Sequence, residues 1–290
     1  MVNERYNIDS VTFFEDFKER LANHYVVSQY SSNPFRASSA GTCARQLGYK
    51  KLYPNEGMDT EQTVDIQFQS LLDLGNTIHD SERELYAKLG YTLEKVEESV
   101  TATYTMDDMS SIDIRGKVDG VISYEDANKN IKYKAVFDIK TAGNGPFNKV
   151  KSMGLPYAYK AQASVYAKAL NVPNVLFIYY NKDTSERMVL EYIDDPLMQE
   201  SVRRRFNKVY ETKDEDTLPD RELKPYRKRE KGKLTDTLVL DPGCGRCLFK
   251  AKCYPEFELN DAGTHFVALL DDFDGEYITK AVKTRTKKED

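Results

Sequence analysis

Two charged side chains stand out in the segment VFDIKTAG, which covers residues 136–143. The valine, phenylalanine and isoleucine of this segment are typical of a buried strand, whereas Asp138 and Lys140 are not. Because side chains alternate across a strand, Asp138 and Lys140 point to the same face. An exposed ion pair is the common explanation for such a pattern and contributes only about 0–1 kcal/mol. The alternative is a metal-binding carboxylate beside a catalytic lysine, and the rest of the chain decides between the two.

A second carboxylate, Asp119, lies in the segment GKVDGVI. If the predicted strands 111–124 and 131–141 form a hairpin, Asp119 and Asp138 converge. Two carboxylates repel each other unless a cation lies between them. Oxygen ligands favour Mg²⁺ or Mn²⁺, and an imidazole moves the preference toward Mn²⁺. His79, on a predicted helix that precedes these strands, is the candidate imidazole, although a lone helix histidine more often serves only in packing.

The helix predicted at 157–170 carries Gln162 and Tyr166, which are four residues apart and therefore share one helix face. Amphipathic helices contain such a pair by chance, so on its own it indicates nothing. Its position in the chain is more informative, because it follows His79, Asp119 and the Asp-Ile-Lys segment in that order.

These residue types in this order, over about residues 40–180, resemble the RecB-like nucleases of the PD-(D/E)XK superfamily. No proline precedes Asp119, and the acidic residue of the D-I-K segment is aspartate rather than glutamate. Both forms are common in the RecB-like branch. The resemblance implies a restriction-endonuclease-like α/β core, in which helices flank a mixed β-sheet, and a metal-dependent nuclease activity.

The resemblance also implies roles for individual residues. It implies a set of ligands for Mg²⁺ or Mn²⁺, formed by His79, Asp119, Asp138 and the backbone carbonyl of Ile139. Lys140 would orient or deprotonate the attacking water and stabilise charge on the phosphate, while Gln162 and Tyr166 would position Lys140 and the DNA backbone. Phosphodiester hydrolysis needs hydroxide at neutral pH and stabilisation of charge on the phosphate oxygens, and a divalent ion serves both needs.

The chain contains four cysteines. Three form a C-x2-C-x5-C cluster at Cys244, Cys247 and Cys253, and the fourth is Cys43. Clustered thiolates indicate a metal site, and tetrahedral coordination requires a fourth ligand, for which zinc is the default metal. One cysteine before the core and three after it instead resemble the iron–sulfur RecB-like nucleases, which include AddB-type subunits and the CRISPR-associated exonuclease family. That resemblance implies a 4Fe–4S cluster that clamps the two ends of a loop of about 200 residues, with zinc as the less favoured metal.

Hydrophobic periodicity predicts the elements that must position these residues. Helices are predicted over residues 10–25, 38–53, 60–90, 157–170 and 195–212. Strands are predicted over residues 92–104, 111–124, 131–141, 174–182 and 186–193. Loops are predicted at 142–156 and 224–233, and a helix or two with a basic tail after residue 265. This order predicts a mixed α/β core with a helical surround. We expect an N-terminal helical segment with one cluster cysteine at residues 1–60 and a nuclease core at residues 61–200. A helical and basic segment with the cysteine cluster and the C-terminal tail is expected at residues 201–290.

Composition limits the class of protein. The chain has 290 residues, 40% hydrophobic and 31% charged, enough for one large domain or two small ones. No apolar run reaches the length of a membrane span, and MVNERYNIDS lacks the apolar core of a signal peptide, so we expect a cytoplasmic protein. Cysteines in that compartment bind metals more often than they form disulfides. The net charge of −5 argues against a general nucleic-acid coat protein.

Basic residues gather in the run KPYRKREKGK, which includes Arg227, Lys228 and Arg229. Together with Arg115 and Lys117, which share a strand face with Asp119, these are the weaker candidates for contact with DNA. A solvated loop explains the run equally well. A basic loop beside an acidic site would suit a polyanionic substrate.

We therefore expect a metal-dependent deoxyribonuclease, an exonuclease acting on single-stranded or frayed DNA in recombination, replication, repair or CRISPR-type adaptation, alongside the proteins of those processes. One alternative is a cluster-bearing DNA-binding subunit without its own nuclease role. The intact set of histidine, two aspartates and lysine argues against that alternative, because a degenerate site is expected to have lost a member. Another alternative is a zinc-stabilised RNA-processing nuclease.

Overall fold

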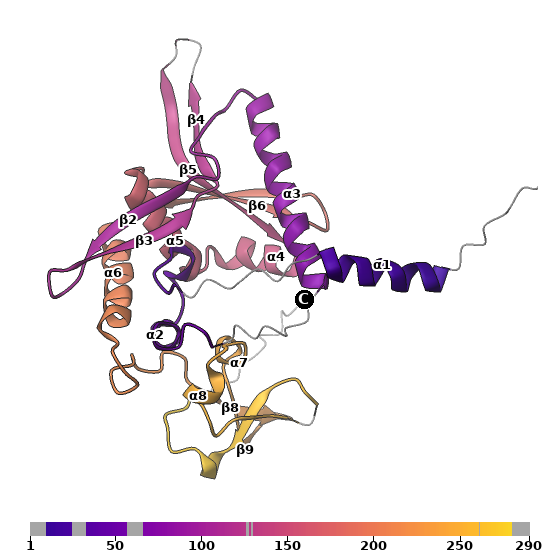
Figure 1. Cartoon of the computed structure of the whole chain (residues 1–290), viewed down its shortest axis with the longest axis vertical. Coiled ribbons are helices and arrows are strands. Elements are labelled where there is room, and N and C mark those ends of the chain that lie inside the picture. The colour runs from indigo at the N-terminus through magenta and orange to yellow at the C-terminus, as the bar shows by residue number, and fades with distance from the viewer. Residues whose placement is uncertain are drawn as a thin grey trace, which may run out of the picture.

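A five-stranded mixed sheet forms the centre of the protein (Figure 1). The computed structural model describes residues 10–24, 33–56, 66–125, 128, 130–260 and 262–279. In spatial order the strands are β1 Thr92–Glu94, β4 Gly120–Glu125, β5 Ile131–Ala142, β6 Asn174–Asn181 and β7 Arg187–Ile193. Strands β5 and β6 are parallel, whereas the other neighbours are antiparallel. The prediction of a mixed α/β fold with a mixed sheet flanked by helices is confirmed.

Helices cover both faces of this sheet. Helix α3 Ile66–Lys88 lies on one face, and helix α5 Tyr157–Leu170 lies on the other. The alternation along β5 follows this arrangement, because Phe137 packs in a cluster with Tyr86 of α3, whereas Val136 packs in the core that contains Val165 of α5. Asp138 and Lys140 have the same parity as Val136, so both lie on the α5 face.

A buried charge attaches α3 to the edge strand β7. Glu82 of α3 is 1% exposed, and its carboxylate accepts hydrogen bonds from Arg187 Nη2 at 2.6 Å and from the Tyr86 hydroxyl at 2.6 Å. Burial raises the pKa of Glu82, but the bonds from Arg187 and Tyr86 outweigh it and hold the pKa below its usual value. Glu82 lies one turn beyond His79, so this contact also fixes the part of α3 that carries the histidine.

The remaining elements surround this centre. The other helices are α1 Ser10–His24, α2 Ala44–Leu52, α4 Asn144–Met153, α6 Pro196–Glu211, α7 Pro242–Gly245 and α8 Lys250–Cys253, with 3-10 turns η1 Ala37–Ser39 and η2 Leu270–Asp272. Strands β2 Ser99–Thr105 and β3 Ser111–Lys117 form a separate antiparallel pair. None of the described helices combines the length and apolar character needed to cross a lipid bilayer.

The C-terminal part forms a second, smaller body below the sheet in Figure 1. Its four strands, in the order β10-β11-β9-β8, are β10 Glu258–Leu259, β11 Phe266–Leu269, β9 Lys233–Val239 and β8 Tyr226–Glu230. The predicted loop at 224–233 is therefore a hairpin, and strand β11 begins at residue 266, where a helix or two was predicted. The pairing of β9 with both β8 and β11 accounts for the difference, since the contact with β11 joins segments that are distant in sequence. The end of the predicted basic tail lies outside the described residues, which end at residue 279.

Three predicted elements are interrupted. The helix predicted at 38–53 begins only at Ala44, with Cys43 as its N-cap residue, after the turn η1. The strand predicted at 92–104 breaks at a turn that contains Glu97 at φ 56°, and the strand predicted at 111–124 breaks before Gly120. Each break occurs where the chain leaves one sheet for another, because β2 and β3 pair with each other while β1 and β4 join the main sheet.

The segment predicted as a loop at 142–156 contains helix α4. The carboxylate of Asp183 accepts a hydrogen bond from the Asn144 N–H at 2.7 Å, and Phe147 is fully buried. Gly154 ends the helix at φ 78°. Its glycine, proline and asparagine residues indicate a loop in sequence, but here they mark the start and the end of a short helix.

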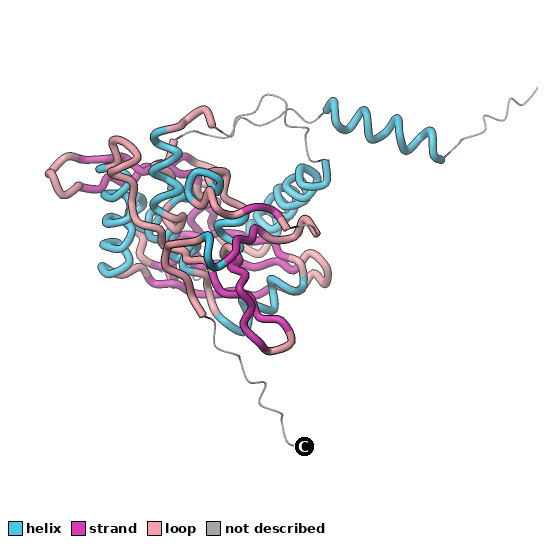
Figure 2. Tube along the Cα trace, turned by 90° about the horizontal axis from the view of Figure 1, so that it is seen from below, coloured by secondary structure: helices cyan, strands magenta, loops and turns pink. Residues whose placement is uncertain are grey.

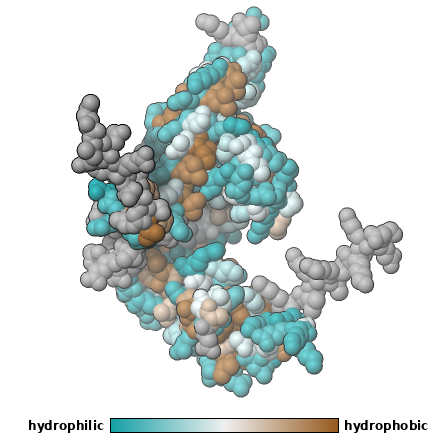
Figure 3. Space-filling view, turned by 90° about the vertical axis from the view of Figure 1, so that its right-hand side faces the viewer, coloured by the Kyte–Doolittle hydropathy of each residue, from teal (hydrophilic) through white to brown (hydrophobic). Residues whose placement is uncertain are grey.

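Helix α1 extends outward beside the lower end of α3 in Figure 1 and lies apart from the rest of the structure in Figure 2. Its phenylalanines Phe13, Phe14 and Phe17 are exposed, as are Leu71 and Leu72 near the start of α3. Figure 3 shows apolar residues at the surface on the same side of the molecule. They lie above a notch between the body that contains the central sheet and the smaller C-terminal body, called here the lower body.

The contact between Glu82 and Arg187 predicts that removing Arg187 destabilises the protein more than removing a lysine from an exposed ion pair. Arg187→Ala leaves the Glu82 carboxylate buried with one remaining donor, so the free energy of unfolding should fall by about 3 kcal/mol. Urea denaturation followed by circular dichroism measures it. Lys151→Ala, which removes an exposed pair with Glu186, is the matched control and should cost less than about 1 kcal/mol. Equal losses in the two variants would contradict a buried anchor.

Candidate functional site

The pair Asp138–Lys140 is buried rather than exposed. Lys140 Nζ lies 2.9 Å from Asp138 Oδ1, and the Asp138 side chain is only 7% exposed. Burial raises the pKa of Asp138 to about 6, with the Asp119 charge adding to the effect and Lys140 opposing it. The other oxygen, Asp138 Oδ2, has no hydrogen-bond partner. A buried carboxylate oxygen with nothing to bind is a vacant acceptor that suits a cation.

Asp119 lies beside this pair, in the break between β3 and β4. Its Oδ2 accepts a hydrogen bond from the Ile139 N–H at 2.7 Å, and its Oδ1 lies 3.6 Å from His79 Nδ1. Burial raises the pKa of Asp119, but His79, the Ile139 N–H and Lys140 outweigh burial and keep the pKa below its usual value. The structure thus brings His79, Asp119, Asp138 and Lys140 to one place, at the end of β5.

Glu97 is a member of this group that sequence analysis missed. His79, Glu97 and Asp119 offer ligand atoms that lie within 4.8 Å of one another. Glu97 also pairs with Arg83, at 2.6 Å, and with Lys117, so two cations already balance its charge. Nothing in the run Glu97-Glu98 distinguishes the two glutamates, because only the turn with positive φ directs Glu97 toward His79.

Lys140 is the first member of a chain of side chains that ends on the backbone. Its Nζ lies 3.5 Å from Gln162 Oε1; Gln162 Nε2 donates to the Tyr166 hydroxyl at 3.0 Å, and that hydroxyl donates to the Lys117 carbonyl at 2.8 Å. Lys140 Nζ also lies 4.7 Å from the centre of the Tyr159 ring. Burial lowers the pKa of Lys140, but Asp138 outweighs it and the pKa is raised, so the ammonium form is favoured.

The basic candidates are placed in two different regions. Arg115 and Lys117 lie on β3, where both side chains are exposed, and Lys117 pairs with Glu97. Residues 227–229 lie on β8 in the lower body, away from β5 (Figure 1). There Arg227 pairs with Asp236, and Lys228 pairs with Glu230. Arg229 donates to the carbonyl of Gly232 at 3.1 Å.

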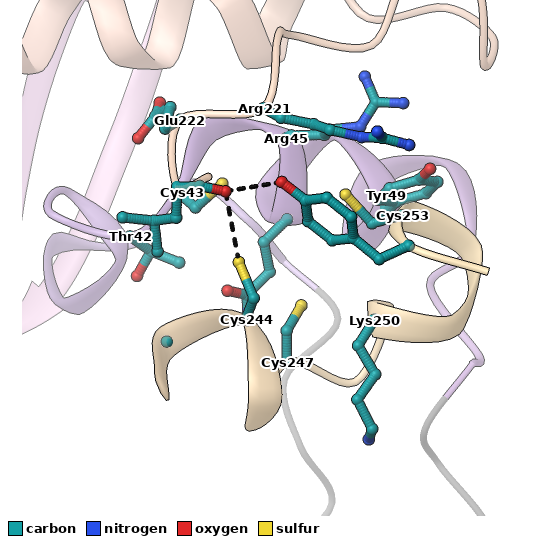
Figure 4. Close-up of a pocket in the computed structure, with 14 residues that line it drawn as sticks. Thr42, Cys43, Arg45, Tyr49, Arg221, Glu222, Cys244, Cys247, Lys250 and Cys253 are labelled. Atoms are coloured by element: carbon teal, nitrogen blue, oxygen red, sulfur yellow. Dashed lines mark hydrogen bonds between the residues drawn. The ribbon is translucent and has the colours of Figure 1, made fainter. Parts of the chain in front are cut away.

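The four cysteines line one cavity of about 170 Å³ (Figure 4). Helix α2 brings Cys43, and the segment of α7 and α8 brings Cys244, Cys247 and Cys253. All four are free thiols. Burial, together with the neighbouring cysteines, raises the pKa of Cys244 to about 12. Burial also raises the pKa of Cys43 and of Cys247. Four thiols that line one cavity form a donor set that a positive metal centre would deprotonate.

Ion pairs and backbone contacts hold Cys43 against the lower body. The Ala44 N–H donates to Glu222 Oε1 at 3.1 Å, and Arg205 of α6 donates to the Thr42 carbonyl at 2.7 Å and to the Glu222 carboxylate at 2.8 Å. Both residues that flank Cys43 are therefore tied to Arg205 or Glu222.

Comparison with known proteins gives loose structural likenesses. No family model and no curated protein matches the chain. The structure named SSO0001 is 16% identical, with a TM-score of 0.42 over 70% of this chain and 86% of that one. LHK-Exo in complex with dAMP is 12% identical, with a TM-score of 0.38 over 68% and 90% of the two chains. The alkaline exonuclease LHK-Exo from Laribacter hongkongensis, also 12% identical, gives 0.37 over 68% and 92%. At these values the function must be argued from the site itself.

The hydrogen bonds that connect Lys140 to the backbone predict that removing the Tyr166 hydroxyl lowers the stability of the protein. Tyr166→Phe leaves Gln162 Nε2 without its acceptor inside the fold, so the free energy of unfolding should fall by about 1–2 kcal/mol. Thermal and urea unfolding measure this loss. Tyr180→Phe removes an exposed hydroxyl that donates to Ser185 Oγ and should change stability by less than about 0.5 kcal/mol. A Tyr166→Phe variant as stable as wild type would contradict the hydrogen bonds that we describe between Gln162, Tyr166 and the Lys117 carbonyl.

Proposed function

We propose that the protein is a metal-dependent deoxyribonuclease of the RecB-like PD-(D/E)XK type. It hydrolyses phosphodiester bonds of single-stranded or frayed DNA, as an exonuclease, in recombination, replication, repair or CRISPR-type adaptation. The observation that supports this most is the buried pair of Asp138 and Lys140, with its vacant oxygen, beside Asp119 and His79. An ordinary surface ion pair would have neither the burial nor the second carboxylate.

The residues at the end of β5 fit Mg²⁺ or Mn²⁺. The proposed ligands share hard oxygen or imidazole donors and are His79, Asp119, Asp138 and the Ile139 carbonyl. A bound ion would polarise the phosphate and lower the pKa of a bound water. The vacant Oδ2 of Asp138 supports its assignment, and Glu97 is close enough to His79 and Asp119 to join or orient this set.

In this proposal, Lys140 stabilises the negative charge of the phosphate. Since Asp138 raises the pKa of Lys140, the side chain is an ammonium at neutral pH, and its role is to stabilise the phosphate oxygens and orient the water rather than to remove a proton. Gln162 and Tyr159 hold the ammonium from two sides, and Tyr166 holds Gln162. The side chain is thus held in place before substrate binds.

A 4Fe–4S cluster is the proposed occupant of the cysteine cavity, bound by Cys43, Cys244, Cys247 and Cys253. All four cysteines line one cavity, and one of them precedes the central sheet in sequence while three follow it. In this proposal that arrangement favours a cluster over a single zinc ion. Its role is a structural clamp between α2 and the lower body.

Replacing Lys140 tests the proposed chemistry. Lys140→Met should fold and bind single-stranded DNA, but single-turnover cleavage of an end-labelled strand with Mg²⁺ or Mn²⁺ should slow at least about 100-fold, because the ammonium is lost. Lys140→Arg should not restore the rate, since the guanidinium has a different shape and hydrogen-bonding geometry. The control Lys134→Met, on the same strand but in an exposed pair with Glu94, should cleave normally.

Three results would contradict this assignment. A Lys140→Met variant as fast as wild type would leave Lys140 as a structural partner of Asp138. If the wild-type protein cleaves a matched RNA strand but not DNA, the substrate is RNA rather than DNA. Loss of binding in parallel with loss of rate would make Lys140 an anchor for phosphate rather than a catalytic group.

The metal centre is tested by colour and composition. Protein purified without oxygen should be brown, with a broad absorbance near about 400 nm that fades on reduction, and should contain iron and sulfide. Cys43→Ser should lose iron and stability together, because it removes the ligand carried by α2. Asp138→Asn, far from the cysteines in sequence and fold, should keep the colour. Colourless wild-type protein with one zinc per chain would refute the iron–sulfur assignment.

A further inference from the structure

A second cavity opens directly onto Lys140. It measures about 540 Å³ and lies between the carboxyl ends of the parallel strands β5 and β6, helix α4 and the start of α5. Lys140 and Tyr159 form part of its wall. Crevices outside the carboxyl ends of parallel strands are frequent ligand sites in α/β proteins, and this volume is within the usual range for small ligands.

The wall of this cavity carries two ammonium groups that no carboxylate in the described structure neutralises, besides Lys140, which pairs with Asp138. Lys149 and Lys182 line it together with Lys140, and the lining contains no carboxylate among the described residues. Neither Lys149 nor Lys182 has an ion-pair partner in the part of the chain that the structure describes. Lys151, two residues further along α4, lies outside the cavity and pairs with Glu186 at 2.7 Å. The two free ammonium groups therefore favour an anionic ligand.

The rest of the wall is apolar and aromatic, with one buried polar atom. Met153 is 74% exposed, and Leu155 and Pro156 continue the apolar surface toward Tyr159. Tyr179, which is 2% exposed, has a hydroxyl without a hydrogen-bond partner. A flat apolar group with polar edges would cover this surface and supply a partner for the hydroxyl, as a nucleobase does.

From these observations we infer that the cavity binds the terminal nucleotide of a DNA single strand. Its phosphate lies between Lys149 and Lys182, and its base lies against Met153, Leu155 and Tyr159, with the next phosphate toward Lys140. This inference rests on the proposed nuclease function and specifies the substrate of the same site. A pocket that accepts one nucleotide at a chain end would explain action from an end rather than within a strand.

Nucleotide binding without cleavage tests the cavity by itself. Equilibrium dialysis in EDTA with labelled deoxythymidine 5′-monophosphate should show tighter binding than deoxythymidine or inorganic phosphate. The double variant Lys149→Ser/Lys182→Ser should bind at least tenfold more weakly. Lys151→Ser, on the same helix but outside the cavity, should bind within twofold of wild type. Met153→Asp, at a position that is 74% exposed, should also weaken binding, because it replaces part of the apolar surface that covers the base with a carboxylate and adds negative charge to a cavity that binds an anion.

Competition distinguishes a strand end from a free mononucleotide. A linear single strand should displace the labelled nucleotide, whereas a circular single strand of equal length should not; equal displacement by both would overturn the assignment to a chain end. Unchanged binding in the double variant would overturn the cavity as the site, even if the protein cleaves DNA. Binding with the expected variant pattern, in a protein that cleaves nothing, would support the cavity and refute the nuclease proposal.

Discussion

The burial of Asp138 is the constraint on which the centre of the molecule depends. A carboxylate placed on the inner face of a central strand, under α5, must be paired or neutral. Lys140 supplies a partner for one oxygen, and the chain from Gln162 through Tyr166 to a backbone carbonyl fixes that partner. The other oxygen remains vacant. Stability alone gives no reason to keep such an arrangement, which is why it indicates a working site.

The elements around Asp138 position the other groups of the site. Strand β5 continues past Gly120, the first residue of β4, so the Ile139 N–H has no partner in β4 and donates to Asp119 instead. Helix α3 brings His79 to the same place and is attached to the sheet through Glu82 and Arg187. On the other side of β5, α4 and α5 leave the cavity next to Lys140. The site is thus formed by the ends of elements that also form the core.

Local patterns in the sequence predicted the parts of the fold that local physics controls. The helix at 157–170 and the β4–β5 hairpin follow from periodicity and turn residues, and both are present. Helix α4 was missed because the acceptor of its N-terminal hydrogen bond, the Asp183 carboxylate, lies about 40 residues later in the chain. Glu97 was missed because a turn conformation, rather than a residue type, brings it to His79. The paired strands after residue 224 depend on contacts between distant segments, which periodicity does not report.

The contacts of α2 have a consequence for the order in which the chain is made. Tyr49 stacks on Phe249 with ring centres 5.5 Å apart, and Lys51 donates to the carbonyls of Tyr210 and Thr212. At translation rates of about 5–20 residues per second, these partners leave the ribosome roughly 10–40 s after α2 does. During that interval α2 keeps an aromatic face and the Cys43 thiol unprotected while the central sheet is already available to fold. A segment that is synthesised late therefore completes the environment of an earlier one, and a pause or truncation after residue 212 would leave the aromatic face of α2 and the Cys43 thiol without these partners.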